Sequence, residues 1–199
     1  MKSKALQAAF TVLLAGSFVV SARAQDQPKG GDVVHAVAGT VRKVDATAKT
    51  IAIRTADGVE HVFKYTDKTV MHASKETEKG AKAGTVDTYM AGKEGTQVVV
   101  HYTEKGGEKT VTGIDDFGKT TVKESKGTVT HVDKGARTVT IKAADGTEGT
   151  YHVAKDATVD TEHGVVKGSE WSAKEGDKVT VHYTEDAGKK VVHLFRRLW

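Results

Sequence analysis

Apolar and polar residues alternate in short runs along most of the chain. Ile51 and Ile53 are separated by one small residue, and Val98 and Val100 follow the same period of two. This period places the apolar side chains on one face of a strand, as in sheets with one buried side. The dipeptide Asp57-Gly58 stands between two such runs and favours a two-residue hairpin turn of type I′. The pattern therefore predicts short antiparallel β-strands joined by tight turns.

Two stretches of the chain repeat the same pattern. Residues 39–45 (GTVRKVD) recur as residues 127–133 (GTVTHVD), and residues 93–104 recur as residues 174–185. The second pair is separated by fewer residues than the first, so the first copy has the longer segment between its third and fourth strands. A repeat of this length predicts a duplicated structural unit.

Each copy contains five predicted strands, and its longest irregular segment follows the third strand. This arrangement is typical of a small OB-type barrel, and a sandwich of two short sheets would show the same alternation. We predict an all-β fold of two tandem five-stranded OB-like antiparallel barrels from an internal duplication. The barrels are expected at residues 33–116 and 127–199, with a polar linker at residues 117–126. Helical hints are confined to residues 74–79, in the insert of the first copy.

The first 24 residues have the pattern of a secretory signal peptide. Two lysines precede the apolar run 5–20, and Ser21-Ala22-Arg23-Ala24 has small residues where signal peptidases require them. We expect cleavage near Ala24, a disordered arm at residues 25–32 and a periplasmic or secreted location. The apolar run is too short for a spanning helix, and we expect no transmembrane segment in the mature chain.

Composition supports the strand prediction and lowers the expected charge. Val and Thr each occur 25 times after residue 24, whereas Leu occurs twice, and β-branched residues favour strands over helices. Cleavage removes Lys2, Lys4 and Arg23 and lowers the net charge from +4 to +1. OB barrels that bind single-stranded nucleic acid use a cationic groove with exposed aromatic rings. We therefore expect no nucleic-acid partner.

The sequence gives little support for catalysis. An exported chain without cysteine has no disulfide, no thiolate nucleophile and no thiolate metal ligand. The motifs of serine hydrolases, zinc peptidases and nucleotide-binding loops do not occur. The adjacent acids Asp115-Asp116 and Glu185-Asp186 fall in predicted turns, where we expect them to be solvated. We expect a non-enzymatic binding or scaffold protein of the bacterial envelope, with a protein or a small ligand as its partner.

The repeated motifs resemble a known group of proteins. Gly-Thr-Val-x-x-Val-Asp, a Thr/Ile strand, Asp-Gly and Lys-Glu-Gly-x-x-Val-x-Val-x-Tyr are similar to the repeats of bacterial exported OB-like proteins of unknown function. The resemblance covers nearly the whole mature chain and implies a barrel in the envelope. A more distant resemblance is to periplasmic copper-binding small barrels, which use a His, a Trp and two Met residues. Met71-His72 and Met90 lie in the first copy and Trp171 aligns with Met90 in the second, so neither copy unites these types.

Histidine is the residue type that offers metal chemistry. Neutral imidazoles bind copper or zinc where two or more converge. His101 and His182 occupy the same position in the two copies, out of phase with the core residues, so we expect both on outer faces. The mature chain contains nine histidines: His35, His61, His72, His101, His131, His152, His163, His182 and His193.

One pair of histidines carries the metal hypothesis. A four-residue turn at Glu185–Gly188 would pair His182 with Val191 and place His193 on the same face, one diagonal away. His163, in the preceding insert, would add the third ligand that such a pair needs, and the tryptophan of that insert would close over it. The sequence thus predicts a copper or zinc site at His182, His193 and His163, as an alternative to a polar outer face without a cofactor.

The C-terminal residues 195–199 combine two arginines with apolar side chains. Such a segment could contact an anionic surface, a partner groove or a membrane interface. We favour the structural alternative, in which Phe195 continues the last strand and Trp199 folds over a barrel end.

Overall fold

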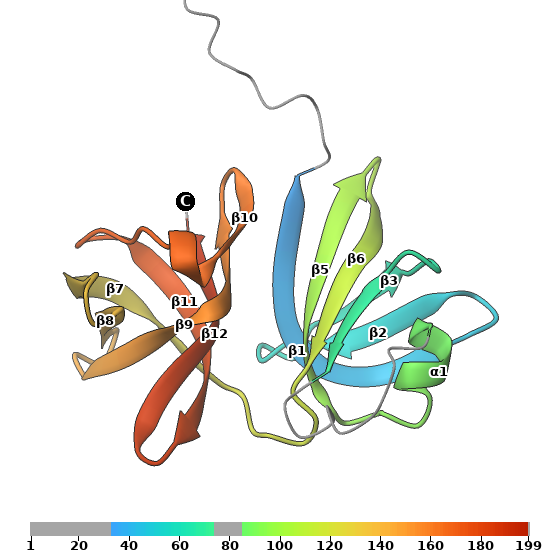
Figure 1. Ribbon diagram of the computed structural model, residues 1–199, viewed down its shortest axis with the longest axis horizontal. Coiled ribbons are helices and arrows are strands. Elements are labelled where there is room, and N and C mark those ends of the chain that lie inside the picture. The colour runs from blue at the N-terminus through green and yellow to red at the C-terminus, as the bar shows by residue number, and fades with distance from the viewer. Residues whose placement is uncertain (1–32, 74–84, 199) are drawn as a thin grey trace, which may run out of the picture. The chain divides into compact units, whose positions relative to one another are not determined.

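A computed structural model describes residues 33–73 and 85–198 (Figure 1). The expected signal peptide, the expected arm, the helical hint and Trp199 lie outside the described residues. Within them, strands dominate, and the helical elements are α1 (Val86–Met90) and the 3₁₀ helix η1 (Gly168–Glu170). The all-β prediction is confirmed.

The first sheet closes into a five-stranded ring. Its hydrogen-bonded order is β3-β2-β1-β5-β6, and β3 meets β6 in parallel through the single pair Lys64 and Thr110. The short strand β4 extends the sheet alongside β6. The strands of this sheet are β1 (Val34–Asp45), β2 (Thr50–Arg54), β3 (Glu60–Lys64), β4 (Val70–Ala73), β5 (Gln97–Lys105) and β6 (Glu108–Asp116).

The second sheet repeats this order with one difference. Its ring is β9-β12-β11-β7-β8, closed by pairing of β8 with β9, and β9 lies parallel to β12 over five residue pairs. The long strand β9 runs without a break through the positions that the first copy divides between β3 and β4. The elements are β7 (Lys123–Asp133), β8 (Thr138–Ala143), β9 (Glu148–Thr161), β10 (Gly164–Lys167), β11 (Lys178–Asp186) and β12 (Lys189–Leu198).

The prediction of two five-stranded OB-like barrels is confirmed, and the alternative, a sandwich of two short sheets, is not. In each ring the third strand lies parallel to the fifth, which closes the sheet on itself. Each sheet also contains a sixth short strand, β4 or β10, in the insert after the third strand, and the sequence pattern did not indicate it. Strand β7 begins at Lys123, within the segment expected to be a linker.

Each barrel has a core of its own on the face that the period of two indicates. Burying these branched side chains stabilises each barrel by the hydrophobic effect. The first core contains Val37, Val41, Ile51, Ile53, Phe63, Tyr65, Met71, Val86, Met90, Val98, Val100, Val111 and Ile114. The second contains Val129, Val139, Ile141, Tyr151, Val153, Ala157, Val159, Trp171, Ala173, Val179, Val181, Tyr183, Val192 and Phe195.

One glycine recurs in both copies for a steric reason. A Cβ atom on Gly39 would lie 2.7 Å from the carbonyl oxygen of Arg54, and one on Gly127 would lie 2.2 Å from that of Lys142. Both distances are shorter than any normal contact, so the first two strands of each barrel approach closely only because glycine stands there. A β-bulge follows directly in both copies.

The hairpin turn at Asp57-Gly58 differs from the predicted type. Only Gly58 has a positive φ, 84°, whereas a type I′ turn needs positive φ at both central residues. The amide of Gly58 donates to the carbonyl of Thr55, which defines a type I turn followed by a left-handed glycine. The type I′ prediction is therefore wrong here, because the loop is one residue longer than a two-residue hairpin.

Residues of the two barrels also contact each other. A small apolar cluster joins Ala36, Ala38 and Val99 of the first barrel to Leu194 of the second. Beside it, Asp160 is 2% exposed. Its carboxylate accepts hydrogen bonds from Arg196 Nε (3.2 Å), His35 Nδ1 (3.3 Å) and the amide of Ala36 (3.5 Å).

Candidate functional site

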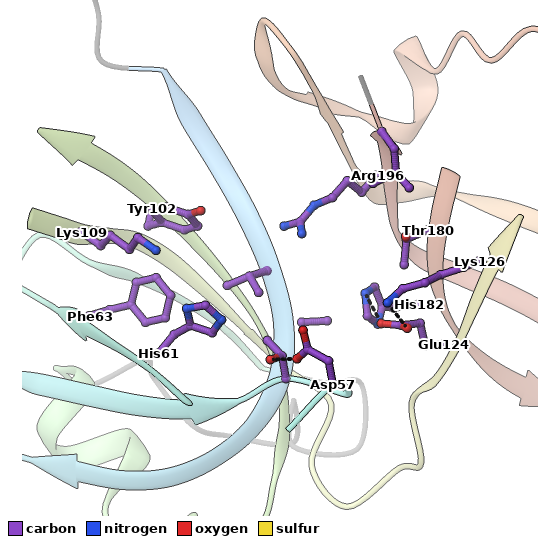
Figure 2. Close-up of a pocket in the computed structure, with 14 residues that line it drawn as sticks. Asp57, His61, Phe63, Tyr102, Lys109, Glu124, Lys126, Thr180, His182 and Arg196 are labelled. Carbon is purple, nitrogen blue, oxygen red and sulfur yellow. Dashed lines mark hydrogen bonds and ion pairs between the residues drawn. The ribbon is translucent and has the colours of Figure 1, made fainter. Parts of the chain in front are cut away.

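A cleft of about 450 Å³ is lined by residues of both barrels (Figure 2). Its volume lies in the range of small-molecule sites. The first barrel contributes Val37, Ala38, Thr55, Asp57, His61, Phe63, Tyr102 and Lys109. The second contributes Glu124, Lys126, Thr180, His182, Arg196 and Leu198.

Two aromatic rings and a lysine form the wall on the side of the first barrel. Phe63 on β3 and Tyr102 on β5 have ring centroids 5.1 Å apart, tilted by 55°. Lys109 on β6 places its ammonium 5.9 Å from the Phe63 centroid and 5.5 Å from that of Tyr102. This geometry gives cation–π attraction to both rings. Phe63 is 1% exposed, so the face offered to the cleft consists mainly of Tyr102 and Lys109.

The second barrel contains the same group of side chains at the aligned positions. Tyr151 and Tyr183 have centroids 5.0 Å apart, and the Lys190 ammonium lies 5.1 and 5.7 Å from them. None of these three residues lines the cleft. The group therefore recurs in both barrels, and its first copy lines this cleft. The alignment of the two copies already places two aromatic residues and a lysine at equivalent positions, and the sequence analysis missed this.

The opposite wall of the cleft combines ionic side chains with a buried histidine. The carboxylate of Glu124 on β7 forms an ion pair with Lys126, whose Nζ atom lies 3.0 Å away. The Nε2 atom of His182 on β11 lies 3.6 Å from the same carboxylate. Burial lowers the pKa of His182 to about 4, and the charges of Arg196 and Lys126 act in the same direction against the opposing charge of Glu124. His182 is therefore neutral at pH 7.

The charge of Arg196 acts on both walls. Burial raises the pKa of Tyr102; the guanidinium of Arg196 opposes that rise, and the charges of Asp160 and Glu104 add to it. The same guanidinium contributes to the lowered pKa of His182. Figure 2 shows Arg196 directed from β12 into the cleft, with Tyr102 and Lys109 opposite it.

The register predicted for the last hairpin is wrong. Ala187 and Gly188 both have positive φ, 46° and 79°, and form a two-residue turn in which Asp186 pairs with Lys189. His182 therefore pairs with Leu194 and not with Val191. The register then shifts between His182 and Tyr183, so that His193 is the extra residue of a β-bulge.

The three residues of the predicted metal site have different surroundings. His182 lies against Glu124, whereas the Nε2 atom of His193 lies 2.8 Å from Thr184 Oγ1 and its ring packs 4.7 Å from that of Phe117. The side chain of His163 is 88% exposed in the turn after β9. Trp171 packs into the second core. Within residues 33–73 and 85–198, no group of three or more His, Cys, Asp or Glu side chains is placed to hold a metal ion.

The first barrel has a cluster that the sequence analysis missed. Asp115 on β6 bridges two imidazoles, with His72 Nδ1 at 2.7 Å from one carboxylate oxygen and His101 Nε2 at 2.8 Å from the other. These hydrogen bonds lower the pKa of Asp115 although burial raises it. The next residue, Asp116, is buried and holds the Lys93 ammonium at 2.7 Å. The prediction that this acidic pair is solvated in a turn is wrong, because both residues belong to a strand.

Sequence comparisons give no relatives for this chain, since no family model and no curated protein matches it. Solved structures of Escherichia coli CusF are similar to about one copy. The silver-bound form has 19% identity over 42% of this chain and 90% of CusF, and the apo form has 16% identity over 45% and 94%. Both have a TM-score of 0.28, which is too low to support an argument about function. In the described part of the chain, no helix has the length and apolar character needed to cross a membrane.

Proposed function

We propose that this chain is a non-enzymatic binding or scaffold protein of the bacterial envelope, and that its ligand or partner binds in the cleft. The observation that carries this proposal is the cavity of about 450 Å³, which has an aromatic and cationic wall on one side and a polar wall on the other. A concave site with a few convergent polar groups is the usual form of a ligand pocket. The export pattern of residues 1–24 supports the envelope location.

The arrangement around His101 supports a role without catalysis. In hydroxyl-based catalysis, an imidazole binds the nucleophile through one nitrogen and the orienting carboxylate through the other. Here Thr158 Oγ1 lies 3.4 Å from His101 Nε2, and Asp115 occupies the same nitrogen at 2.8 Å. One nitrogen cannot serve both partners, so this group lacks a proton relay.

A fragment screen followed by amide NMR tests the cleft. Leu198 lines the cleft and is 47% exposed, so Leu198→Trp should narrow the cavity without disturbing a core. Val70 on β4 is 52% exposed and does not line the cleft, which makes Val70→Trp the matched control. We expect fragments to shift cleft amides in the wild type and in Val70→Trp, and to bind Leu198→Trp more weakly. Fragment shifts that gather elsewhere would contradict the proposal.

The alternative function is copper or zinc binding through His182, His193 and His163. The observation that favours it is the lowered pKa of His182, because a neutral imidazole keeps the lone pair that a metal needs. Calorimetry with Cu²⁺ and Zn²⁺ tests it. Stoichiometric binding that is lost in both His182→Ala and His193→Ala, and kept in the exposed control His131→Ala, would support this site. Wild-type binding no tighter than that of the variant carrying both His182→Ala and His193→Ala would contradict it.

A further inference from the structure

We propose that the cleft contains a subsite for an oxyanion, held between the hydroxyl of Tyr102, the ammonium of Lys109 and the guanidinium of Arg196. This inference rests on the proposed binding function and names the chemistry of the ligand. Figure 2 shows the Tyr102 hydroxyl and the Lys109 ammonium on one side of the cleft and the Arg196 guanidinium on the other. A carboxylate or a sulfate or phosphate group accepts hydrogen bonds from all three donor types.

Lys109 brings a positive charge to the wall of the cleft formed by the first barrel. Its ammonium lies over the rings of Phe63 and Tyr102, and its cross-strand neighbour on β5 is Glu104. The other lysine of the cleft, Lys126, is already paired with Glu124. An incoming anion would therefore find in Lys109 a cation whose position is set by ring packing.

Arg196 is held in place by two hydrogen bonds, and some of its N–H donors remain available. Its Nε atom donates to Asp160, and one terminal nitrogen donates to the carbonyl of Ala36. A guanidinium has five N–H donors, so these contacts leave others available. Because Asp160 and Ala36 orient the group before any ligand arrives, a bound anion would cost little further side-chain entropy.

Tyr102 supplies a neutral donor. Its pKa is raised by burial, so its hydroxyl keeps its proton at pH 7. The two acidic side chains that line the cleft have other partners. Asp57 accepts a hydrogen bond from the hydroxyl of Thr55, and Glu124 forms an ion pair with Lys126. Neither carboxylate is therefore free to take the place of the anion.

The aligned group in the second barrel provides an internal control. Lys190 packs on Tyr151 and Tyr183 with nearly the same distances, but it does not line the cleft. The loss of packing in Lys109→Met and in Lys190→Met should therefore be similar. Only Lys109→Met removes a charge from the cleft.

The test is an NMR titration of the purified protein with sodium sulfate and, separately, sodium acetate, at an ionic strength held constant with sodium chloride. Backbone amides around Tyr102 and Lys109 and the Nε–H signal of Arg196 report on the site. We expect saturable shifts, with the tetrahedral and planar anions distinguished by affinity. Losing one charged hydrogen-bond partner should weaken binding in Lys109→Met about tenfold or more, and Lys190→Met should stay within about twofold.

Tyr102→Phe removes the hydroxyl and keeps the ring, so it tests the site even if Lys109→Met folds poorly, with Tyr183→Phe as its control. Shifts that grow linearly with both anions, or equal losses in Lys109→Met and Lys190→Met, would overturn the oxyanion subsite. If the fragments still bind in the cleft and are weakened by Leu198→Trp, the proposed binding function stands and only the anion assignment fails.

Discussion

At the scale of single residues, burial decides the behaviour of His182. The sequence indicated its face correctly, because it lies out of phase with Val181 and Tyr183, which belong to the core. The outer face that carries it is covered rather than open, and His182 is 9% exposed. A period of two reports which side of a strand a residue occupies, but it contains no information about what covers that side.

This burial predicts a dependence of stability on pH. The pKa of His182 is 6.5 in the unfolded reference and about 4 in the folded chain, so the unfolded state binds a proton first as the pH falls. The stability contributed by the neutral ring is complete above pH 6.5 and is lost on going down towards pH 4. The shift corresponds to about 3 kcal/mol over this window.

Denaturant unfolding between pH 8 and pH 4 measures this effect. We expect the free energy of unfolding of His182→Gln to change less over the window than that of the wild type. His131→Gln is the control, since the side chain of His131 is 68% exposed. Asp115 loses its contribution at lower pH, because its pKa is lowered below 3.8. Parallel curves for the wild type and His182→Gln would show that the imidazole does not resist protonation.

At the scale of elements, strands were predictable and their registers were not. The alternation that buries Ile51 and Ile53 depends on neighbours along the chain, and it placed the barrel strands correctly. Register depends on the turn and on bulges, and the turn at Ala187-Gly188 moved every pairing of β11 with β12. The predicted pairing of His182 with Val191 was wrong for this reason, since it assumed a longer turn.

The same turn predicts a stabilising substitution. Ala187 adopts φ 46°, a left-handed conformation that costs an alanine about 1 kcal/mol. Asparagine tolerates this region and with Gly188 forms the preferred type I′ pair. We expect Ala187→Asn to raise the free energy of unfolding by about 0.5–1 kcal/mol, measured by thermal and urea unfolding. Ala144→Asn, at an exposed turn residue without positive φ, should be near neutral. A destabilised Ala187→Asn would contradict this turn geometry.

At the scale of the whole molecule, a buried carboxylate connects strands that are far apart in the sequence. Asp160 on β9 binds Arg196 on β12 and His35 on β1. No local pattern could have indicated this group, because its members are separated by up to 161 positions between His35 and Arg196. The cleft depends on the same contacts, since Arg196 belongs to its wall.

Removing the carboxylate charge should therefore weaken the fold. Asp160→Asn leaves Arg196 without its ionic partner, and because the Arg196 side chain is 31% exposed we expect a loss of about 1–3 kcal/mol, less than for a fully buried pair. Urea unfolding measures the loss. Asp156→Asn, at an exposed residue of the same strand, is the control and should change stability little. A neutral Asp160→Asn would mean that this network contributes nothing measurable to folding.

The single ladder pair that joins β3 to β6 has a dynamic consequence. In the second barrel β9 and β12 are paired at five positions, whereas the first barrel divides the same junction into four pairs between β4 and β6 and one between β3 and β6, so β3 is the weakly held strand. Local opening follows such weak points, and amide hydrogens beside Lys64 and Thr110 should exchange with solvent faster than those between β9 and β12. Phe63 and Lys109 are the immediate neighbours of this pair. A ligand that holds Lys109 would stabilise the junction of β3 with β6 and slow this exchange. Occupancy of the cleft would therefore change amide exchange in the first barrel and leave exchange between β9 and β12 unchanged.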